Sequence, residues 1–300
     1  MADTKYGYLV KTLKYDTSSG ECMTMPTGAD LEGINLSFAW GYRRQPGVWG
    51  GDGGIGHVHP YGECLIFAGL DYDRLNYLGA EIEVAMGDEG EKHVFDSNTL
   101  VIAPPAFPHC PVTTRKVEKP FGFLAISLDG VHKTTESPAK GTSAADKKYA
   151  NLVKTLEMHK IDGDPKGNAD YIAGWNGKDV EGVVLNFTWA FHSGTGFWHT
   201  HDPHVHPTEE ALLFVGLDPD RPDYLGAEIE VRLGEEQEPH VFDKPTVVAL
   251  PKGLVHCPLI TRAVEKPYAF SAISLSTEHN TTWLGGDPNM ENKFAGPKKS

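Results

Sequence analysis

The stretch HVHPYGECLIFAGLDYDRLNYLGAEIEVAMGDEGEKHVFD at residues 57–96 decides the fold, because it occurs twice. It aligns without a gap with HVHPTEEALLFVGLDPDRPDYLGAEIEVRLGEEQEPHVFD at residues 204–243, at a constant offset of 147. The offset persists through VEKPFGFLAISL and VEKPYAFSAISL, which end at Leu128 and Leu275. Two long copies predict two similar domains rather than a solenoid, whose repeats are usually about 20–50 residues long.

The repeat extends upstream and sets the expected domain boundaries. DLEGINLSFAW pairs with DVEGVVLNFTW at an offset of 149, and LVKTL occurs at 9–13 and again at 152–156. Between the copies, SPAKGTSAADKK has no apolar period and is typical of a linker. We therefore expect domains at 1–136 and 149–278, a linker at 137–148 and a tail at 279–300.

The apolar runs within each copy are short and predict strands. INLSFAW, CLIFAGL, AEIEVAM, TLVIAP and FGFLAISL recur as VVLNFTW, ALLFVGL, AEIEVRL, TVVALP and YAFSAISL. They are rich in β-branched and aromatic residues and are separated by Gly, Pro and Asp, which is typical of a sandwich or barrel. Each copy is predicted to be all-β, with short helices only near the linker and in the tail.

Composition excludes several classes of partner. The chain has 41 acidic and 27 basic residues, giving a formal net charge of −14, which argues against binding a nucleic-acid backbone or an anionic membrane. No apolar run reaches the roughly 18 residues of a membrane span, and the start of the sequence lacks the apolar core of a signal peptide. We expect a cytoplasmic protein that acts on a small molecule, with association into a homo-oligomer left open.

The repeated histidines can supply a metal site. On an extended segment residues i and i+2 point to the same face, so His57 and His59 can aim at one point, as can His204 and His206. The proline that follows each pair starts a turn, which lets Glu63 or Glu210 begin the return strand facing the histidines, whereas Glu209 faces away. A fourth candidate follows a later turn: His109 in the first copy and His256 in the second.

Three imidazoles and one carboxylate suit a divalent first-row ion with one or two positions left open. Fe and Mn are the first expectations, with Ni, Co and Zn as alternatives. The opposing interpretation is a pair of surface histidines with an incidental glutamate. Cys110 and Cys257 each follow a candidate histidine, and strand alternation predicts that they turn away from it as small buried side chains.

These motifs resemble the cupins, and specifically the two-domain bicupins, over roughly 30–130 and 179–277. The first cupin motif has a glycine, HxH, a glutamate and a second glycine, and Gly51, His57, His59, Glu63 and Gly69 nearly match it, with the last gap one residue short. The second copy matches at His204, His206, Glu210 and Gly216, with Trp198 at the leading glycine.

The second cupin motif, PxGxxH, is met by Pro251, Gly253 and His256. In the first copy Pro104 and His109 fit it, while Ala106 stands at the glycine, where a positive φ would be strained. The resemblance implies two tandem antiparallel β-barrels of the double-stranded β-helix, jelly-roll-like type. Each barrel would hold a metal on its three histidines and one glutamate.

The resemblance also implies a function. We expect a metal-dependent enzyme acting on a small oxygen-rich molecule such as an enol, a phenol or a dicarbonyl acid, with dioxygenation first because many cupins with this ligand set are dioxygenases. Glu63 or Glu210 would stay bound to the metal or act as a catalytic base. The alternatives are a redox-neutral lyase, decarboxylase or isomerase using Mn, Ni or Zn, and a non-catalytic binding protein.

The two copies differ just before the HxH pair. The first has the glycine-rich WGGDGGIG, whereas the second has WHTHDP with the additional His199 and His201. These two histidines could support the metal site, transfer protons there, serve as alternative ligands, or lie in a solvent-exposed loop. Sequence alone does not decide which site is catalytic.

Overall fold

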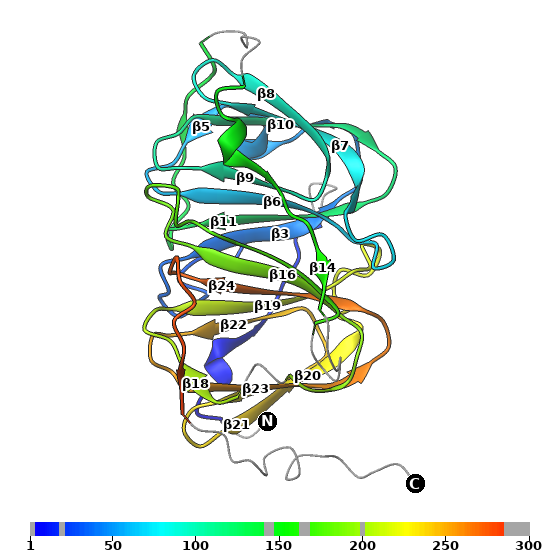
Figure 1. Ribbon diagram of the computed structural model, residues 1–300, viewed down its shortest axis with the longest axis vertical. Coiled ribbons are helices and arrows are strands. Elements are labelled where there is room, and N and C mark those ends of the chain that lie inside the picture. The colour runs from blue at the N-terminus through cyan, green and yellow to red at the C-terminus, as the bar shows by residue number, and fades with distance from the viewer. Residues whose placement is uncertain (1–3, 18–21, 141–146, 162–168, 199–201, 285–300) are drawn as a thin grey trace.

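The computed structural model is almost entirely β and describes residues 4–17, 22–140, 147–161, 169–198 and 202–284. Each half contains two antiparallel sheets that face each other as a barrel. The halves follow one another along the long axis of the molecule, the N-terminal one at the top of Figure 1. The predicted pair of antiparallel barrels is therefore confirmed.

The N-terminal barrel is built from two six-stranded sheets. The first sheet runs β13 (Val153–Thr155), β9 (Thr99–Ala103), β6 (Glu63–Gly69), β11 (Phe121–Ser127), β3 (Ser37–Arg43) and β2 (Cys22–Thr24). The second sheet runs β12 (Thr135–Glu136), β5 (His57–Val58), β10 (His109–Val117), β7 (Tyr77–Met86) and β8 (Glu91–Ser97), with β4 (Gly47–Val48) also paired to β10.

The C-terminal barrel repeats this plan with one more strand in its larger sheet. That sheet runs β1 (Val10–Thr12), β22 (Thr246–Leu250), β19 (Glu210–Gly216), β24 (Tyr268–Ser274), β16 (Asn186–His192), β15 (Tyr171–Asn176) and β14 (His159–Lys160). The smaller sheet runs β21 (Glu238–Phe242), β20 (Ala227–Leu233), β23 (His256–Val264), β18 (His204–Val205) and β25 (Thr282–Trp283), with β17 (Gly196–Phe197) also paired to β23.

Helical structure in the described residues is limited to three short 3₁₀ segments, η1 (Gly7–Leu9), η2 (Gly51–Gly54) and η3 (Ala150–Leu152). The last of these lies next to the predicted linker, where a short helix was expected. The expected helix in the tail falls partly on residues 285–300, which are outside the described residues. No helix in the described ranges is long and apolar enough to cross a membrane.

The two halves exchange their first strands. β1, from the start of the first copy, pairs with β22 of the C-terminal barrel, and β13, from the start of the second copy, pairs with β9 of the N-terminal barrel. In Figure 1 the blue N-terminal segment accordingly lies against the lower barrel and the green segment around η3 against the upper one. The repeat LVKTL therefore belongs in sequence to one half and in space to the other.

A pair of glutamates holds each exchanged segment. The carboxylate of Glu91 accepts hydrogen bonds from the backbone N–H groups of Lys148 and Tyr149, at 2.9 and 3.2 Å. At the equivalent place Glu238 accepts from the N–H groups of Lys5 and Tyr6, both at 3.0 Å. Two charge-assisted bonds to consecutive backbone donors fix the direction in which the segment enters the sheet.

A continuous apolar core joins the two barrels. One cluster of buried side chains draws on both halves, and at its centre Trp40 packs against Trp189 with ring centroids 5.3 Å apart. Both indoles are buried, as expected for core residues. The residue boundaries of the two domains stay a prediction, because the exchanged strands and the shared core connect the halves.

Candidate metal centres

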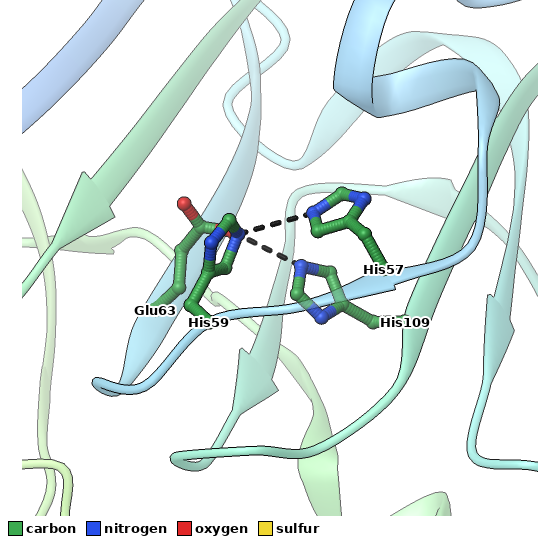
Figure 2. A group of neighbouring side chains, drawn as sticks. All are labelled: His57, His59, Glu63 and His109. Carbon is green, nitrogen blue, oxygen red and sulfur yellow. Dashed lines mark hydrogen bonds and ion pairs between the residues drawn. The ribbon is translucent and has the colours of Figure 1, made fainter. Parts of the chain in front are cut away.

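The predicted ligands of the N-terminal barrel come together at one end of it. His57 and His109 are direct partners across β5 and β10, and Glu63 is the first residue of β6. His59 follows β5 and completes the set. One ligand atom from each of the four lies within 4.8 Å of those of the other three, and all four residues are buried. Figure 2 shows the four side chains pointing toward one another.

Backbone carbonyls orient all three imidazoles of this quartet. The Nδ1–H groups of His57, His59 and His109 face the carbonyls of Ile55, Lys133 and Phe107 at 2.8, 2.7 and 3.1 Å. A carbonyl can only accept, so Nδ1 carries the proton and the lone pair is on Nε2. Three Nε2 lone pairs therefore converge on one point, which is the arrangement that a metal ion requires.

The glutamate is oriented in the same way. Oε1 of Glu63 accepts a hydrogen bond from the hydroxyl of Ser127 at 2.7 Å, which leaves Oε2 at 3.1 Å from Nε2 of His109 and 3.3 Å from Nε2 of His59. Burial opposes ionisation of this carboxyl group, but the adjacent His109 and His59 outweigh it and hold the pKa of Glu63 well below its ordinary value. The quartet thus offers one negative charge and three neutral donors.

The contact between two of the imidazoles of this quartet is one that a divalent cation would relieve. Nε2 of His57 lies 3.0 Å from Nε2 of His59, so two nitrogens that both expose lone pairs face each other. Burial, with the neighbouring His109, lowers the pKa of His57 to about 4, so this ring is neutral near neutral pH and its Nε2 lone pair is available to a cation. A metal ion between the two nitrogens removes the repulsion of their lone pairs.

The C-terminal barrel contains the equivalent quartet in a looser arrangement. Nδ1 of His204, His206 and His256 faces the carbonyls of Asp202, Asn280 and Leu254, and the Ser274 hydroxyl donates to Oε1 of Glu210 at 2.7 Å. Oε2 of Glu210 lies 3.5 Å from His206 and 3.6 Å from His256. The buried Nε2 atoms of His206 and His256 have no hydrogen-bond partner among the described residues, so they too are available to a cation.

Cys257 differs from the expectation for a strand. It was predicted to turn away from its histidine neighbour, yet its sulfur groups with the ligand atoms of His204 and His256 within 4.8 Å. The backbone explains the difference, because φ at Cys257 is 69°, which interrupts strand alternation. Burial raises the pKa of this thiol well above its ordinary value, so in the metal-free protein it stays protonated.

The turn before His109 confirms the strain predicted at Ala106. Ala106 has a φ of 59°, and the matching Gly253 has a φ of 76°. Both residues donate their N–H group to the carbonyl of the second histidine of the pair, His59 or His206. The turn therefore couples the two halves of each site, and the alanine adopts a left-handed conformation that favours glycine.

Sequence analysis missed the segments that close each site. After β11, residues 129–136 run past the N-terminal quartet, where Lys133 provides the carbonyl for His59 and β12 pairs with β5. After β24, residues 277–283 do the same in the other half, where Asn280 serves His206 and β25 pairs with β18. The repeat itself was the available signal, since GVHKTTE and TEHNTTW keep the 147-residue offset.

Polar side chains on this segment gather beside the N-terminal quartet. The His132 ring lies 5.1 Å from the His59 ring, and its Nε2 is 2.7 Å from Oδ2 of Asp52 on η2. Tyr61 stacks on His59 with ring centroids 5.1 Å apart, and its hydroxyl accepts from the N–H group of Lys133. His279 occupies the matching place in the C-terminal half, 4.6 Å from His206. The predicted support from His199 and His201 lies outside the described residues.

Two antiparallel barrels, each with three histidines and one glutamate directed to one point at the barrel end, define the bicupin fold.

Comparison with solved structures supports this assignment of the fold. No family model matches the chain, and no curated protein does. Structures of oxalate decarboxylase match it at 12% identity with a TM-score of 0.61, covering 92% of this chain and 79% of theirs. They include a deletion variant of the Bacillus subtilis enzyme, a structure concerned with the substrate binding mode, and one concerned with the Mn(II) centres of the Bacillus subtilis enzyme. At this identity the likeness concerns the fold.

Proposed function

We propose that this protein is a metal-dependent enzyme that acts on a small organic acid by a redox-neutral reaction such as decarboxylation. The observation that carries the proposal is the convergence of three correctly oriented imidazoles and one ionised carboxylate in the N-terminal barrel. The similar solved structures are oxalate decarboxylases with Mn(II) centres, which makes Mn(II) the first ion to test here.

Within this proposal the quartet residues act mainly as ligands. A bound ion would be held by Nε2 of the three histidines and Oε2 of Glu63, and it would supply Lewis acidity for carboxylate and carbonyl oxygens. Glu63 is better placed as a fixed ligand than as a mobile base, because its Oε1 would have to give up the hydrogen bond from Ser127 before it could move. The same reasoning applies to Glu210 and Ser274.

The polar groups beside the N-terminal quartet would handle the proton that decarboxylation requires. Asp52 accepts a hydrogen bond from His132, and burial, which would raise the pKa of Asp52, is outweighed by its bonds from His132 and Thr134. Asp52 is thereby held as a carboxylate that fixes the orientation of His132. The imidazole of His132 and the phenol of Tyr61 both pack against the His59 ring, so they are the groups that we assign to proton exchange with a molecule bound at this quartet.

A dioxygenase is the second candidate, because three imidazoles and one carboxylate also suit iron, and sequence analysis favoured oxygen chemistry. One experiment compares the two functions. Protein loaded separately with Mn(II) and Fe(II) would be incubated with small carboxylic acids while CO₂ release and O₂ uptake are recorded. We expect CO₂ release with Mn(II) and without stoichiometric O₂ consumption. Stoichiometric O₂ uptake would favour the dioxygenase, and failure to take up any divalent ion would refute both.

A further inference from the structure

The inner walls of the two barrels can be compared row by row from the strand register. Glu63 lies opposite Ser127 on β11, and Ser127 lies opposite Ser37 on β3. The Ser127–Glu63 hydrogen bond shows that this face points to the quartet. Two residues further along each strand, the next row on the same face consists of Leu65, Ala125 and Ala39.

The corresponding rows of the C-terminal barrel carry larger side chains, and two of the three that differ are also more polar. Where the N-terminal barrel has Ser37 and Ala39, this barrel has Asn186 and Thr188 at the same positions of the repeat. The glutamate also has a partner on the strand at its other side. This partner is Ala103 of β9 in the N-terminal barrel and Leu250 of β22 in the C-terminal one. Ala125 and Ala272 are identical in the two walls. All three changes make the N-terminal wall smaller.

The residues of both walls are partly exposed. This holds for Ala39 and Ala125 in the N-terminal barrel and for Asn186, Thr188 and Ala272 at the equivalent positions of the C-terminal barrel. The adjacent Trp40 and Leu124, which point to the opposite face, are 0% and 1% exposed, so the exposed alanine surface lies inside the barrel. The next row on the same face, about 7 Å further along the strands, contains the buried Phe67 and Phe123. The two walls therefore differ in the side chains that they expose, which are alanines in the N-terminal barrel and include Asn186 and Thr188 in the C-terminal one.

The two sites also differ at the barrel rim, the strand that pairs with the first histidine of each quartet. Glu136 is the strand partner of His57, whereas Trp283 is the partner of His204 in the C-terminal barrel. The Trp283 ring lies 4.9 Å from the His204 ring. An indole therefore lies beside one ligand of the C-terminal quartet, while the exposed Glu136 stands at that position in the N-terminal one.

We propose that the N-terminal barrel binds the organic substrate and that this substrate is a carboxylic acid carrying a short apolar group, with its oxygens at the quartet and the apolar group against Ala39 and Ala125. The inference rests on the proposed function, since it assumes that the quartet holds a metal ion. Apolar surface gains free energy against the alanine wall. Against Thr188 and Asn186 of the other barrel, the same group would displace water from polar side chains without replacing its hydrogen bonds.

Isothermal titration of the Mn(II)-loaded protein with acetate, propionate, butyrate and oxalate tests the substrate class. We expect affinity to rise about threefold to fourfold with each added methylene, as burial of apolar surface predicts, and butyrate to bind more tightly than oxalate. Affinity that is flat or falls along the series, or tighter binding of oxalate, would overturn the assignment. This result is separable from the proposed function, because metal uptake and turnover of other acids can persist when the series fails.

A matched pair of variants tests which barrel binds the apolar group of the acid. Ala125→Leu covers the exposed alanine surface of the N-terminal wall and should weaken butyrate binding more than tenfold without changing the bound Mn(II), whereas Ala272→Leu at the same position of the other barrel should leave butyrate binding unchanged. Ala39→Thr, which introduces the residue of the C-terminal wall, should weaken butyrate binding in the same direction and decides the matter if Ala125→Leu does not fold. Loss of binding in Ala272→Leu alone would reverse the assignment.

Discussion

The two quartets share their ligands and the backbone groups that orient them, but not their surroundings. In each barrel three carbonyls fix the imidazoles and one serine fixes the glutamate. The four N-terminal residues form one group within 4.8 Å, while the C-terminal residues are divided between two groups that share His256, one of which includes Cys257. The two sites thus have the same set of histidines and glutamate but a different wall and rim, which is the basis of the proposal that only one of them binds the organic substrate.

Removing one ligand from each site should produce the largest difference between the halves. His57→Ala should lose the ion of the N-terminal quartet, lowering activity by more than the roughly 100-fold that loss of an outer hydrogen-bond partner can cause. His204→Ala should lose the other ion and keep most of the activity. Elemental analysis and turnover of the same preparations provide the check. Equal loss of activity in both variants would mean that both sites are catalytic, and unchanged metal content in both would refute the ligand assignment.

Acid should destabilise the metal-free C-terminal half more than the N-terminal half. Burial, with the neighbouring His256 and His109, lowers the pKa of His204 and His57 to about 4. The unfolded chain therefore binds protons below about pH 6.5 that the folded protein does not, and each residue costs up to about 3 kcal/mol of stability by pH 4.

The second histidine of each pair makes the difference between the halves. Burial lowers the pKa of His206, which adds to the loss of stability as the pH falls. Burial acts in the same direction on His59, but the bond to Glu63 outweighs it and raises the pKa, so protonation there favours the folded state below about pH 6.5. Hydrogen exchange of the metal-free protein at pH 7 and pH 5 should show earlier opening of β18 than of β5. The opposite order would contradict these directions.

The serine beside each glutamate offers a more conservative comparison. Ser127→Ala and Ser274→Ala both remove the hydroxyl that orients the carboxylate, and each should weaken metal binding by about 10–100-fold at its own site. Competition with a chelator measures the two affinities separately. Because the ligands of the N-terminal quartet are closer together, we expect the smaller loss there. No change in either variant would show that strand geometry alone orients the glutamates.

Substitutions in the turn of the second cupin motif should have the smallest effect, a small change in stability. Ala106→Gly should stabilise the protein by up to about 1 kcal/mol, and Gly253→Ala should destabilise it by a similar amount, because both residues have a positive φ. No atom lies within 4 Å of the position that a Cβ would occupy at Gly253, so this substitution tests backbone conformation without a steric clash. Thermal unfolding of the pair is the measurement. Changes of the same sign in both variants would contradict the explanation.

The repeat and the side-chain alternation of strands were enough to predict two barrels and two clusters of three histidines and one glutamate, while the role of these residues as metal ligands stays a prediction. Their success depends on local rules: the i, i+2 spacing of His57 and His59, and a proline turn that brings Glu63 back toward them. The orienting carbonyls could not be predicted, because a backbone group such as that of Lys133 carries no mark in the sequence. The residues at positions 132 and 279 were within reach, since both are histidine at the repeat offset.

The barrel wall and the exchanged strands could be recognised only in the three-dimensional structure. Ala39 is an ordinary strand residue until its row and exposure are known, and LVKTL has the same sequence whichever sheet it joins. Cys257 shows where a local rule fails, because one positive φ placed its sulfur near the ligands that alternation predicted it would avoid.

The exchange of β1 and β13 means that neither barrel is complete without residues from the other half of the sequence. A barrel produced alone, without the opposite segment, would present the unpaired edge of β9 or β22, whose sequences TLVIA and TVVAL are apolar and rich in β-branched residues. Such an edge is a template for pairing with another chain. The same architecture in a chain with one copy of the repeat would require two chains to trade this strand, so the duplication joins in one chain what would otherwise be a dimer.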